Sequence, residues 1–361
     1  LVRRVLGPRE DFFDMKNVYV ADLLHHVLRS RQDFTEMKDM FRPENALNIT
    51  YLALNLSHYI NGVAKKHGEV SRLMFAEYSI DAITNGVHAA TWVAKPVQDV
   101  YDRHIPGWRQ DNFSLRYGLS IPDVEMWEAH MQAKRELLAY LNHEVNVGME
   151  VKVFTIGYAR RAVAYKRADL LFTDIERLKH IAANVGPLQL VYGGKAHPRD
   201  IEGKEIIKQL LTFVRRPEIR EHVVFIEGYD MHLARCLLQG ADVWLNTPRR
   251  PLEASGTSGM KAALNGVLNA SILDGWWCEG YKPETGWAIG KGEEYQDHAY
   301  QDVVESSALY DLIESDVVPL FYGRAADGLP RAWMARMKRS MRLLPPVFST
   351  TRMLWEDAER Y

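Results

Sequence analysis

The sequence predicts an α/β protein with a doubly wound parallel sheet, preceded by a helical segment and followed by C-terminal helices. From about Met149 onward, short runs of apolar and β-branched residues alternate with segments of helical periodicity. Glycine or proline stands at many of the joints between them. Short, almost wholly apolar strands that alternate with helices are typical of parallel sheets covered on both faces.

The first hundred residues are predicted to be mostly helical. Val18–Arg29 and Asn48–His67 place apolar residues at helical spacing. Turn residues follow at Asn85-Gly86-Val87-His88, and Met126–Asn142 then predicts a further helix. This part of the chain therefore contributes helices rather than strands.

The alternating region contains five predicted strands separated by helices. The strands are expected at Val151–Ile156, Leu188–Tyr192, His222–Ile226, Ala241–Leu245 and Val267–Leu273, and the helices at Lys166–Val185, Glu202–Val214, Met231–Leu238 and Ser258–Leu264. The tail, Ser306–Tyr361, is predicted to be helical again. Ligands of such sheets bind at the carboxyl ends of the strands, so the site is expected after Ile156, Tyr192, Ile226 and Leu245.

Composition excludes several classes of partner. The 45 basic and 47 acidic residues give a net charge of −2, so neither nucleic acid nor an anionic membrane is expected. Cys236 and Cys278 have no metal-ligand spacing and are too few for a disulfide framework, which favours a reducing, cytoplasmic setting without a metal site. We expect neither a membrane span nor a signal peptide.

The most specific segment is Glu253-Ala254-Ser255-Gly256-Thr257-Ser258-Gly259-Met260-Lys261. A helix is predicted to begin at Ser255-Gly256-Thr257, where small residues let an anion approach the free N–H groups of the first turn. Lys261 follows Thr257 by four residues, roughly 6 Å along a helix axis. A phosphate at the helix start and an amine one turn further match the two ends of pyridoxal phosphate.

Two basic segments are expected at the same sheet edge. Arg160–Arg167 carries four cations in eight residues, and Gly193-Gly194-Lys195-Ala196-His197-Pro198 follows the next strand. Arginine forks and lysine point charges both suit phosphate. Taken singly, each segment also fits a plainer interpretation, as a solvated basic turn or a lysine on a glycine-rich helix start. Three anion-friendly segments at one edge favour a phosphate site.

In order along the chain, these segments resemble the α-glucan phosphorylases. Glu253–Lys261 is similar to the pyridoxal-lysine motif of that family, Arg160–Arg167 to its basic phosphate segment, and Gly193–Pro198 to its lysine loop. Further similar strings contain His58, Asn85, Trp92, Tyr229 and Phe348–Arg352. Asn85–His88 and Leu273–Trp277 are more similar to the short bacterial and archaeal phosphorylases than to the animal glycogen enzymes.

The resemblance implies the C-terminal catalytic half of such an enzyme, one Rossmann-like half of a GT-B two-domain glycosyltransferase. The implied reaction is phosphorolysis of α-1,4-glucan or maltodextrin by inorganic phosphate, giving glucose 1-phosphate with retention. The 5′-phosphate of pyridoxal phosphate would act as the proton shuttle. Two adjacent phosphates repel each other, which explains why several cations are needed.

The resemblance also implies a role for each matching residue. Lys261 would carry the cofactor as a Schiff base, with the cofactor phosphate against Arg160, Lys166, Gly256 and Thr257 and its ring near Trp92 and Tyr229. Arg161 and Lys166 would bind the substrate phosphate, and His58, Asn85, Tyr165, Glu253 and Ser255 the glucosyl unit. Lys261, Arg161, Lys166 and His58 are the expected catalytic residues. For His58, a polar residue on a buried helix is the plainer interpretation.

The resemblance leaves the extent of the enzyme open. Residues 1–95 are expected to be a helical remnant of the N-terminal phosphorylase domain, 96–345 the cofactor- and phosphate-binding domain, and 346–361 a terminal helix that crosses back. The chain opens on Leu1 rather than Met, so we expect a piece of a longer protein. Because the resemblance covers almost none of the family's N-terminal domain, we expect the isolated chain to be inactive. A homodimer and a missing N-terminal half both stay open as partners.

Two other interpretations stay open beside the phosphorylase. The chain would be one half of a split or truncated enzyme, or a nucleotide-sugar-dependent retaining GT-B glycosyltransferase. In the latter a glutamate usually stands in place of Lys261, so this lysine argues against it. Val163 and Gly259 differ from the animal enzymes, which have histidine and asparagine there, and both changes are expected to leave the chemistry intact.

Overall fold

A computed structural model describes residues 49–145, 147–217, 219 and 222–360. The predicted helix Val18–Arg29 lies outside these residues. The chain divides into two compact units. The described part of the smaller unit comprises residues 49–61 and 75–81, and the larger unit comprises residues 62–74 and those from 82 onward.

The smaller unit contains helix α3 (Ile49–Leu56). The predicted helix Asn48–His67 is therefore interrupted at residues 57–64, and its last residues, from Lys65, belong to a second helix. A short strand β1 (Asn61–Gly62) follows and pairs with β2 (Asp81–Ala82), and a separate helix α4 (Lys65–Met74) lies between them in sequence. Gly62 allows β1 to approach α4 closely, because a Cβ there would lie 2.7 Å from the backbone nitrogen of Gly68.

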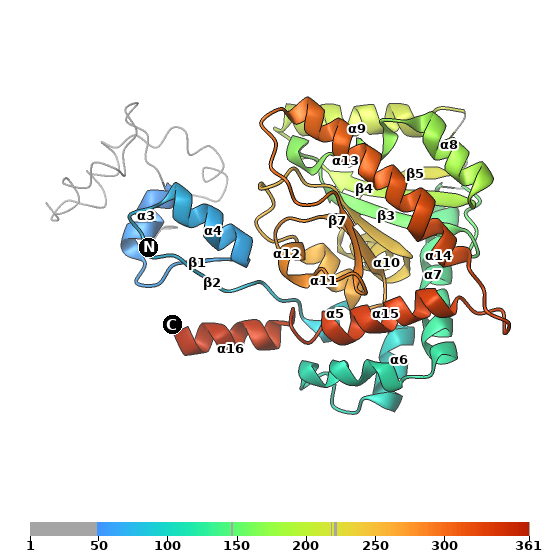
Figure 1. Cartoon of the computed structure of the whole chain (residues 1–361), viewed down its shortest axis with the longest axis horizontal. Helices are drawn as coiled ribbons and strands as arrows, with labels where there is room; N and C mark the ends of the chain where they lie inside the picture. The colour runs from blue at the N-terminus through green and yellow to red at the C-terminus, as the bar shows by residue number, and fades with distance from the viewer. Residues whose placement is uncertain (1–48, 146, 218, 220–221, 361) are drawn as a thin grey trace, which may run out of the picture. The chain divides into compact units, whose positions relative to one another are not determined.

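The larger unit is built around a six-stranded sheet in the order β5-β4-β3-β6-β7-β8, with every pair parallel (Figure 1). The predicted fold class is thus confirmed. The strands are β3 (Phe154–Arg161), β4 (Leu188–Lys195), β5 (Val223–Ile226), β6 (Val243–Asn246), β7 (Leu268–Ile272) and β8 (Gly286–Ile289). Sequence reasoning missed β8.

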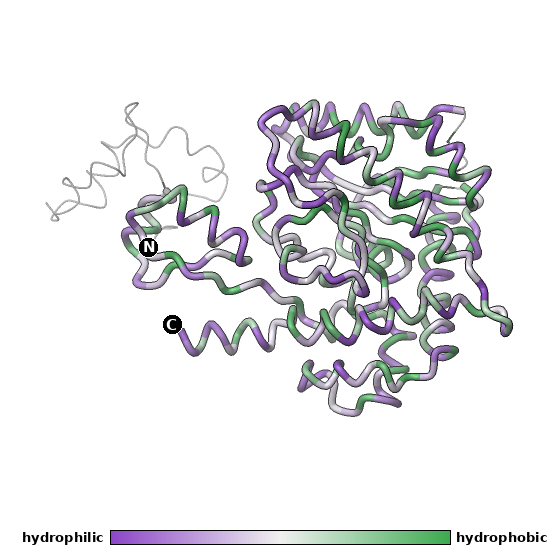
Figure 2. The backbone as a smooth tube through the Cα atoms, viewed as in Figure 1, coloured by the Kyte–Doolittle hydropathy of each residue, from purple (hydrophilic) through white to green (hydrophobic). Residues whose placement is uncertain are grey.

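Helices cover both faces of the sheet, as alternating side chains on the strands require. On β6, Trp244 joins one apolar cluster, whereas Val243 and Leu245 join the other. The cluster containing Trp244 is completed by α5 (Ala89–Trp92), α6 (Lys95–His104), η4 (Asn112–Ser120), α7 (Asp123–Val145), α10 (Met231–Gly240), α11 (Thr257–Ala263) and α12 (Trp277–Gly280). The strands and the inward helix faces are the most hydrophobic parts of this unit (Figure 2).

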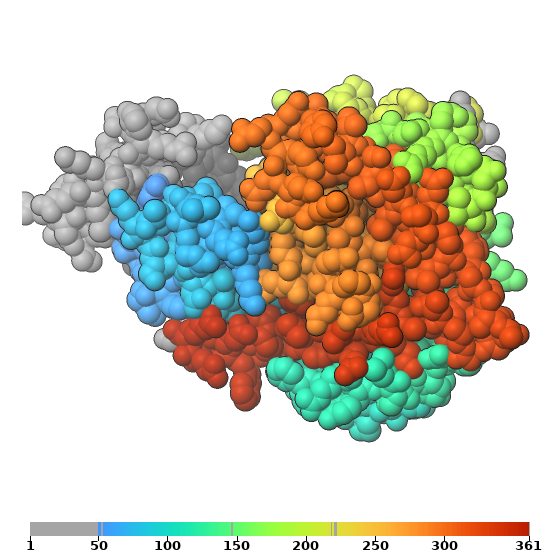
Figure 3. Space-filling view, in the orientation of Figure 1, coloured from blue at the N-terminus to red at the C-terminus, as the bar shows by residue number. Residues whose placement is uncertain are grey.

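The second cluster is covered chiefly by helices that follow β3 and β4 in the chain and by helices that follow β8. They are η6 (Leu170–Phe172), α8 (Ile175–Asn184), α9 (Ile201–Val214), α13 (His298–Leu312), the π-helical turn η7 (Ile313–Val317), α14 (Val318–Tyr322) and α15 (Arg331–Leu343). Helix α15 also packs on α7 and η4, and Figure 3 shows its surface beside theirs. The predicted helical tail is confirmed by α13 to α15 and by α16 (Thr350–Arg360).

The predicted helix Lys166–Val185 is correct only in its second half. Residues before Asp174 form two short 3-10 turns, η5 (Ala164–Lys166) and η6. Arg167 interrupts the helix, because its backbone is left-handed, with φ of 48°. Its nearly buried guanidinium donates to the carbonyl oxygens of Thr247 (3.0 Å) and Pro248 (3.0 Å).

The described residues contain no helix that is both long enough and apolar enough to cross a membrane. The predicted domain limits at residues 95 and 345 stay predictions.

Candidate active site

The candidate site lies at the carboxyl ends of β3 and β6, where the strand order reverses. The chain leaves β3 toward β4 on one side, and it leaves β6 toward β7 on the other. Loops that diverge in this way leave a crevice, which is the usual ligand site of doubly wound sheets. An open cavity of about 450 Å³ lies there. Its wall contains most of the predicted site residues, namely Asn85, Arg160, Arg161, Tyr165, Lys166, Glu253, Ser255, Gly256 and Thr257.

The basic residues at this edge belong to strands, not to loops. Arg160 and Arg161 are the last residues of β3, opposite Gly194 and Lys195 on β4. The predicted strand ends at Ile156 and Tyr192 are therefore too early. Gly194 permits the longer pairing, because a Cβ there would lie 2.5 Å from the Arg160 carbonyl oxygen. The pairing sets Arg161 and Lys195 side by side, as expected of basic segments at one sheet edge.

A single carboxylate is shared by two of the cations. Glu253 forms ion pairs with Lys166 and with Arg160, the latter at 3.5 Å. All three side chains are close to 10 % exposed. Burial lowers the pKa of Lys166 to about 8; the charge of Arg160 adds to this effect and Glu253 opposes it. With Arg161 in the same wall, positive charge exceeds negative charge, which favours an anionic ligand.

Several polar atoms around the cavity have no hydrogen-bond partner among the described residues. They are Arg160 Nε, Ser255 Oγ and Asn246 Oδ1. Arg160 Nη2 donates to Ser258 Oγ (3.3 Å), which also accepts from Trp244 Nε1 (3.0 Å). Sequence reasoning assigned no role to Ser258, although its place next to Thr257 in the motif was a signal.

Helix α11 begins at Thr257, as predicted, after Gly256 in a left-handed conformation with φ of 84°. Lys261 lies one turn along this helix, and its Nζ is 4.0 Å from the centre of the Trp92 ring. Burial lowers the pKa of the Lys261 amine. A lysine with a lowered pKa has a larger neutral fraction, which is the form that reacts with a carbonyl group.

Three of the remaining predicted residues, Tyr229, Tyr165 and Asn85, belong to the larger unit, whereas His58 belongs to the smaller one. Tyr229 follows β5, and its ring lies so close to Gly193 that a Cβ there would be 3.2 Å from Cδ2. The Tyr165 ring centre is 4.6 Å from Lys166 Nζ, and burial raises the pKa of both tyrosines. Asn85 is held by its backbone, since Arg352 of α16 donates to its carbonyl oxygen (3.2 Å). His58 is exposed and belongs to the smaller unit, so its role stays a prediction.

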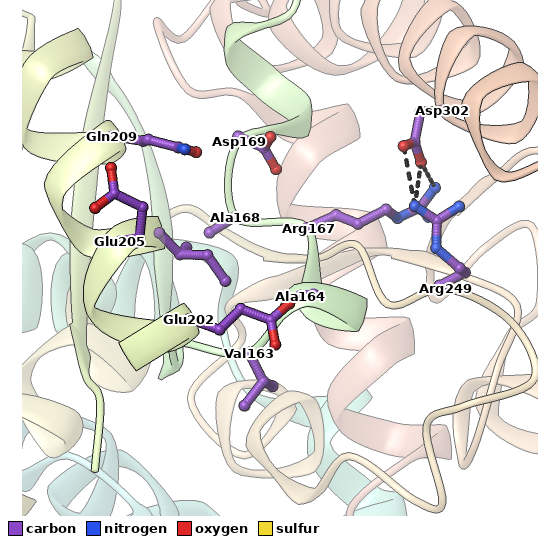
Figure 4. Close-up of a pocket in the computed structure, with 11 residues that line it drawn as sticks. Val163, Ala164, Arg167, Ala168, Asp169, Glu202, Glu205, Gln209, Arg249 and Asp302 are labelled. Atoms are coloured by element: carbon purple, nitrogen blue, oxygen red, sulfur yellow. Dashed lines mark hydrogen bonds and ion pairs between the residues drawn. The ribbon is translucent and has the colours of Figure 1, made fainter. Parts of the chain in front are cut away.

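A second cavity, of about 290 Å³, opens on the other side of the basic segment (Figure 4). Its two arginines, Arg167 and Arg249, both pair with Asp302 at 2.9 Å. Asp169, Glu202 and Glu205 also line it. Because its cations are neutralised and its other charges are acidic, this cavity does not suit phosphate.

Fold and site together define a doubly wound α/β domain with an anion site and a half-buried lysine at the topological switch point. Residues 12–282 match the model of the carbohydrate phosphorylase family. The chain belongs to this family, which confirms the resemblance.

Named relatives agree with this assignment. The chain is 38% identical to a glycogen phosphorylase of Aquifex aeolicus, over 98% of this chain and 54% of that protein. It is 40% identical to a maltodextrin phosphorylase of Thermococcus litoralis, over 89% of this chain and 41% of that protein. A glycogen phosphorylase of Mycobacterium tuberculosis is 36% identical, over 87% of this chain and 40% of that protein. The chain thus spans about half the length of the curated relatives it matches.

Proposed function

We propose that this chain carries the catalytic machinery for phosphorolysis of an α-1,4-glucan, such as glycogen or maltodextrin, to glucose 1-phosphate with retention. The observation that carries the proposal is the convergence of Arg160, Arg161 and Lys166 on one cavity in which Glu253 is the one carboxylate in the described wall. Such a surplus of positive charge suits two phosphates in contact, which would otherwise repel by several kcal/mol.

Pyridoxal phosphate fits the residues present. Lys261 offers an amine with a lowered pKa beside the flat Trp92 ring. Arg160 Nε and Ser255 Oγ lack partners among the described residues, so the site has hydrogen-bonding capacity to spare. We infer that Lys261 holds the cofactor covalently, that Arg160, Lys166, Gly256 and Thr257 hold its phosphate, and that Trp92 and Tyr229 flank its ring. When bound, the cofactor supplies a phosphate that exchanges a proton with the substrate phosphate.

The chain's own groups would act on the substrate mainly by charge. Arg161 and Lys166 bind inorganic phosphate and hold its oxygens near the glycosidic bond. These cations hold the negatively charged phosphate beside the sugar, and the phosphate in turn stabilises the positive charge that the sugar develops as the bond breaks. Glu253, Ser255, Asn85 and Tyr165 orient the glucosyl unit, and His58 is assigned to the same task by resemblance alone. No pair of carboxylates is needed, because phosphate serves as the acid.

The test is chemical labelling of the lysine. The chain is incubated with pyridoxal phosphate, reduced with borohydride, digested and mapped. The label is expected on Lys261, and Lys261→Arg should abolish it. Lys195→Arg, at the same sheet edge, is the matched control and should leave the labelling intact. Labelling on a different lysine would contradict the proposal.

The same preparation separates the alternatives. A nucleotide-sugar-dependent transferase would bind a nucleoside diphosphate sugar and take up no pyridoxal phosphate. A half of a split enzyme would be labelled at Lys261 but would release glucose 1-phosphate from maltodextrin and phosphate only with its partner. The enzyme containing the whole family architecture is expected to do so alone. A homodimer is a further proposal, tested by its mass in solution.

A further inference from the structure

Asp274 is a buried carboxylate that the proposed reaction does not use. It follows β7 and is 2 % exposed. Among the described residues no ion pair neutralises it. Burial raises its pKa to about 6, so an ionised Asp274 is costly at neutral pH. A buried carboxylate of this kind is expected to have a structural or functional role.

The hydrogen bonds of Asp274 point to the loop that follows β6. One oxygen, Oδ2, accepts from the backbone N–H of Glu253 (2.8 Å), and Oδ1 accepts from its neighbour Gly275 (2.9 Å). Two residues on, Trp276 N–H donates to the carbonyl oxygen of Ser255 (2.8 Å). The turn after β7 therefore clamps the backbone at Glu253 and Ser255, across two neighbouring strands.

Close packing makes this clamp rigid. Gly275 has a left-handed φ of 52°, and a Cβ there would lie 2.4 Å from the Ser255 carbonyl oxygen. The clamped residue, Glu253, in turn pairs with Lys166 and Arg160. Backbone position at residue 253 thus decides whether its carboxylate reaches these two cations.

We propose that Asp274 is a positioning residue of the phosphate site, which it controls by holding the Glu253 carboxylate between Lys166 and Arg160. That the controlled site binds phosphate rests on the proposed function, whereas the contacts of Asp274 with the Glu253 loop do not depend on it. Asp274 acts through Glu253 and does not touch the substrate. Its effect reaches Lys166, because the Glu253 carboxylate favours the charged form of that amine, against the effects of burial and of Arg160 and Arg161.

The test follows the ionisation of Lys166 by NMR in the chain labelled with ¹³Cε-lysine, with Lys166→Arg to assign the signal. In Asp274→Asn, the midpoint of the Lys166 titration should fall by about one pH unit, because its counter-charge is no longer held in place. Glu253→Gln should lower the midpoint at least as far. In the double variant, Asp274→Asn should add nothing to Glu253→Gln.

Asp297→Asn is the matched control. Asp297 also accepts two backbone N–H groups, from Ala299 (2.8 Å) and Tyr300 (3.2 Å), at the start of α13. The Asp297→Asn change should leave the midpoint of the Lys166 titration unchanged. Arg250, Glu253 and Cys278 also face Asp274, and Arg160, Arg161, Glu253 and Tyr165 face Lys166. All of them are kept in the test proteins, except Glu253 in the two variants that replace it.

Two results would overturn the positioning role: an unchanged Lys166 midpoint in Asp274→Asn, or shifts that simply add in the double variant. Calorimetric titration of the cofactor-loaded chain with inorganic phosphate tests the proposed function separately. Absence of phosphate binding by the unaltered chain, with the Lys166 shift present, would count against the phosphorylase reaction and leave the role of Asp274 intact.

Discussion

At the amino ends of β3 and β6, Asp242 accepts hydrogen bonds from His130 Nε2 (2.9 Å), Lys134 and the Thr155 backbone (2.8 Å). These three side chains, of His130, Lys134 and Asp242, are 0 % exposed. At the carboxyl ends of the same strands, Arg160 and Lys166 share the carboxylate of Glu253 beside an open cavity, and Arg161 lies in the wall of that cavity.

The two ends of one pair of strands therefore serve different purposes. At the amino end, burial alone would raise the pKa of Asp242, but Lys134 and His130 hold it below its ordinary value. Charge is balanced there, and none of these side chains is exposed to a ligand in solvent. At the carboxyl end charge is unbalanced, and we expect anionic ligands to balance it. The first network is expected to govern stability, and the second to govern binding.

The largest expected effect concerns the amino ends of β3 and β6, where the charge of Asp242 is balanced. Asp242→Asn removes the counter-charge of a fully buried lysine, which should cost about 3–5 kcal/mol of unfolding free energy. Urea denaturation of the chain measures it. Asp123→Asn is the control, since Asp123 pairs with Lys338 and Arg331 at a partly exposed site and should cost less than about 1 kcal/mol. Similar losses of unfolding free energy in both variants would show that the buried Asp242 network does not govern stability.

The next effect concerns the unbalanced end. Arg161→Ala in the cofactor-loaded enzyme should lower phosphorolysis by a factor of about 10²–10³, as loss of one preorganised charge does, while the bound cofactor is retained. Stability should change by less than about 0.5 kcal/mol, because Arg161 is exposed at a strand end. Arg160→Ala, by contrast, should lose the cofactor. Cofactor absorbance and kcat/KM for phosphate are the measurements; equal loss of cofactor from both variants would refute this division of roles.

A smaller effect should appear with pH. Because burial lowers the pKa of Lys166 to about 8, phosphate affinity should fall by up to about tenfold per pH unit above that value. Between pH 8 and the ordinary lysine pKa, the unfolded chain binds the extra proton, so this group makes folding stability rise with pH in that window. Lys166→Met should remove both trends, and Lys208→Met on the exposed side of α9 should remove neither. A phosphate affinity unaffected by pH above 8 would contradict the assignment.

The smallest effect separates a hydroxyl that serves the site from one that does not. Ser258→Ala removes the acceptor of both Trp244 Nε1 and Arg160 Nη2, at a cost of about 1–2 kcal/mol in unfolding free energy. Ser340→Ala is the matched control, because its fully buried Oγ has no described partner. That change should be neutral or stabilising. Thermal unfolding of both variants, with and without cofactor, would show whether they differ.

Much of the fold could be predicted, because buried parallel strands are visible in the sequence as runs of apolar residues. The first and last residues of the strands and helices could not be predicted, because they depend on pairing between distant segments. Arg161 and Lys195 continue β3 and β4 beyond the apolar residues, since glycine at position 194 allows close approach. Likewise, the tertiary contacts of Arg167, not its neighbours in sequence, end the predicted helix at Lys166–Val185. Strand β8 is as short as β5 and β6, but its three apolar residues lie between Gly286 and Gly290, and glycines so placed are more typical of a loop.

The candidate site was predictable where its residues lie in compact motifs. Arg160–Arg167 and Glu253–Lys261 supplied the residues that the cavity brings together. Asp274 lies in the string Leu273–Trp277, but its role gave no signal, because its partner is the backbone N–H of Glu253, twenty-one residues earlier in the chain. A backbone group that takes part in such a hydrogen bond leaves no trace in the residue type at its position. For the same reason Arg352 could be placed in a family string but not assigned to the carbonyl oxygen of Asn85.

The neighbouring strands β3 and β6 have a consequence for how the protein is made. Arg160 and Glu253 meet in the folded domain but are 93 residues apart in the chain. At about 5–20 residues per second, a ribosome needs about 5–20 s to proceed from one to the other. During that interval β3 lacks its inner neighbour and its cations lack the Glu253 carboxylate. The crossover that creates the crevice therefore also delays assembly of the candidate site until β6 and Glu253 have been synthesised.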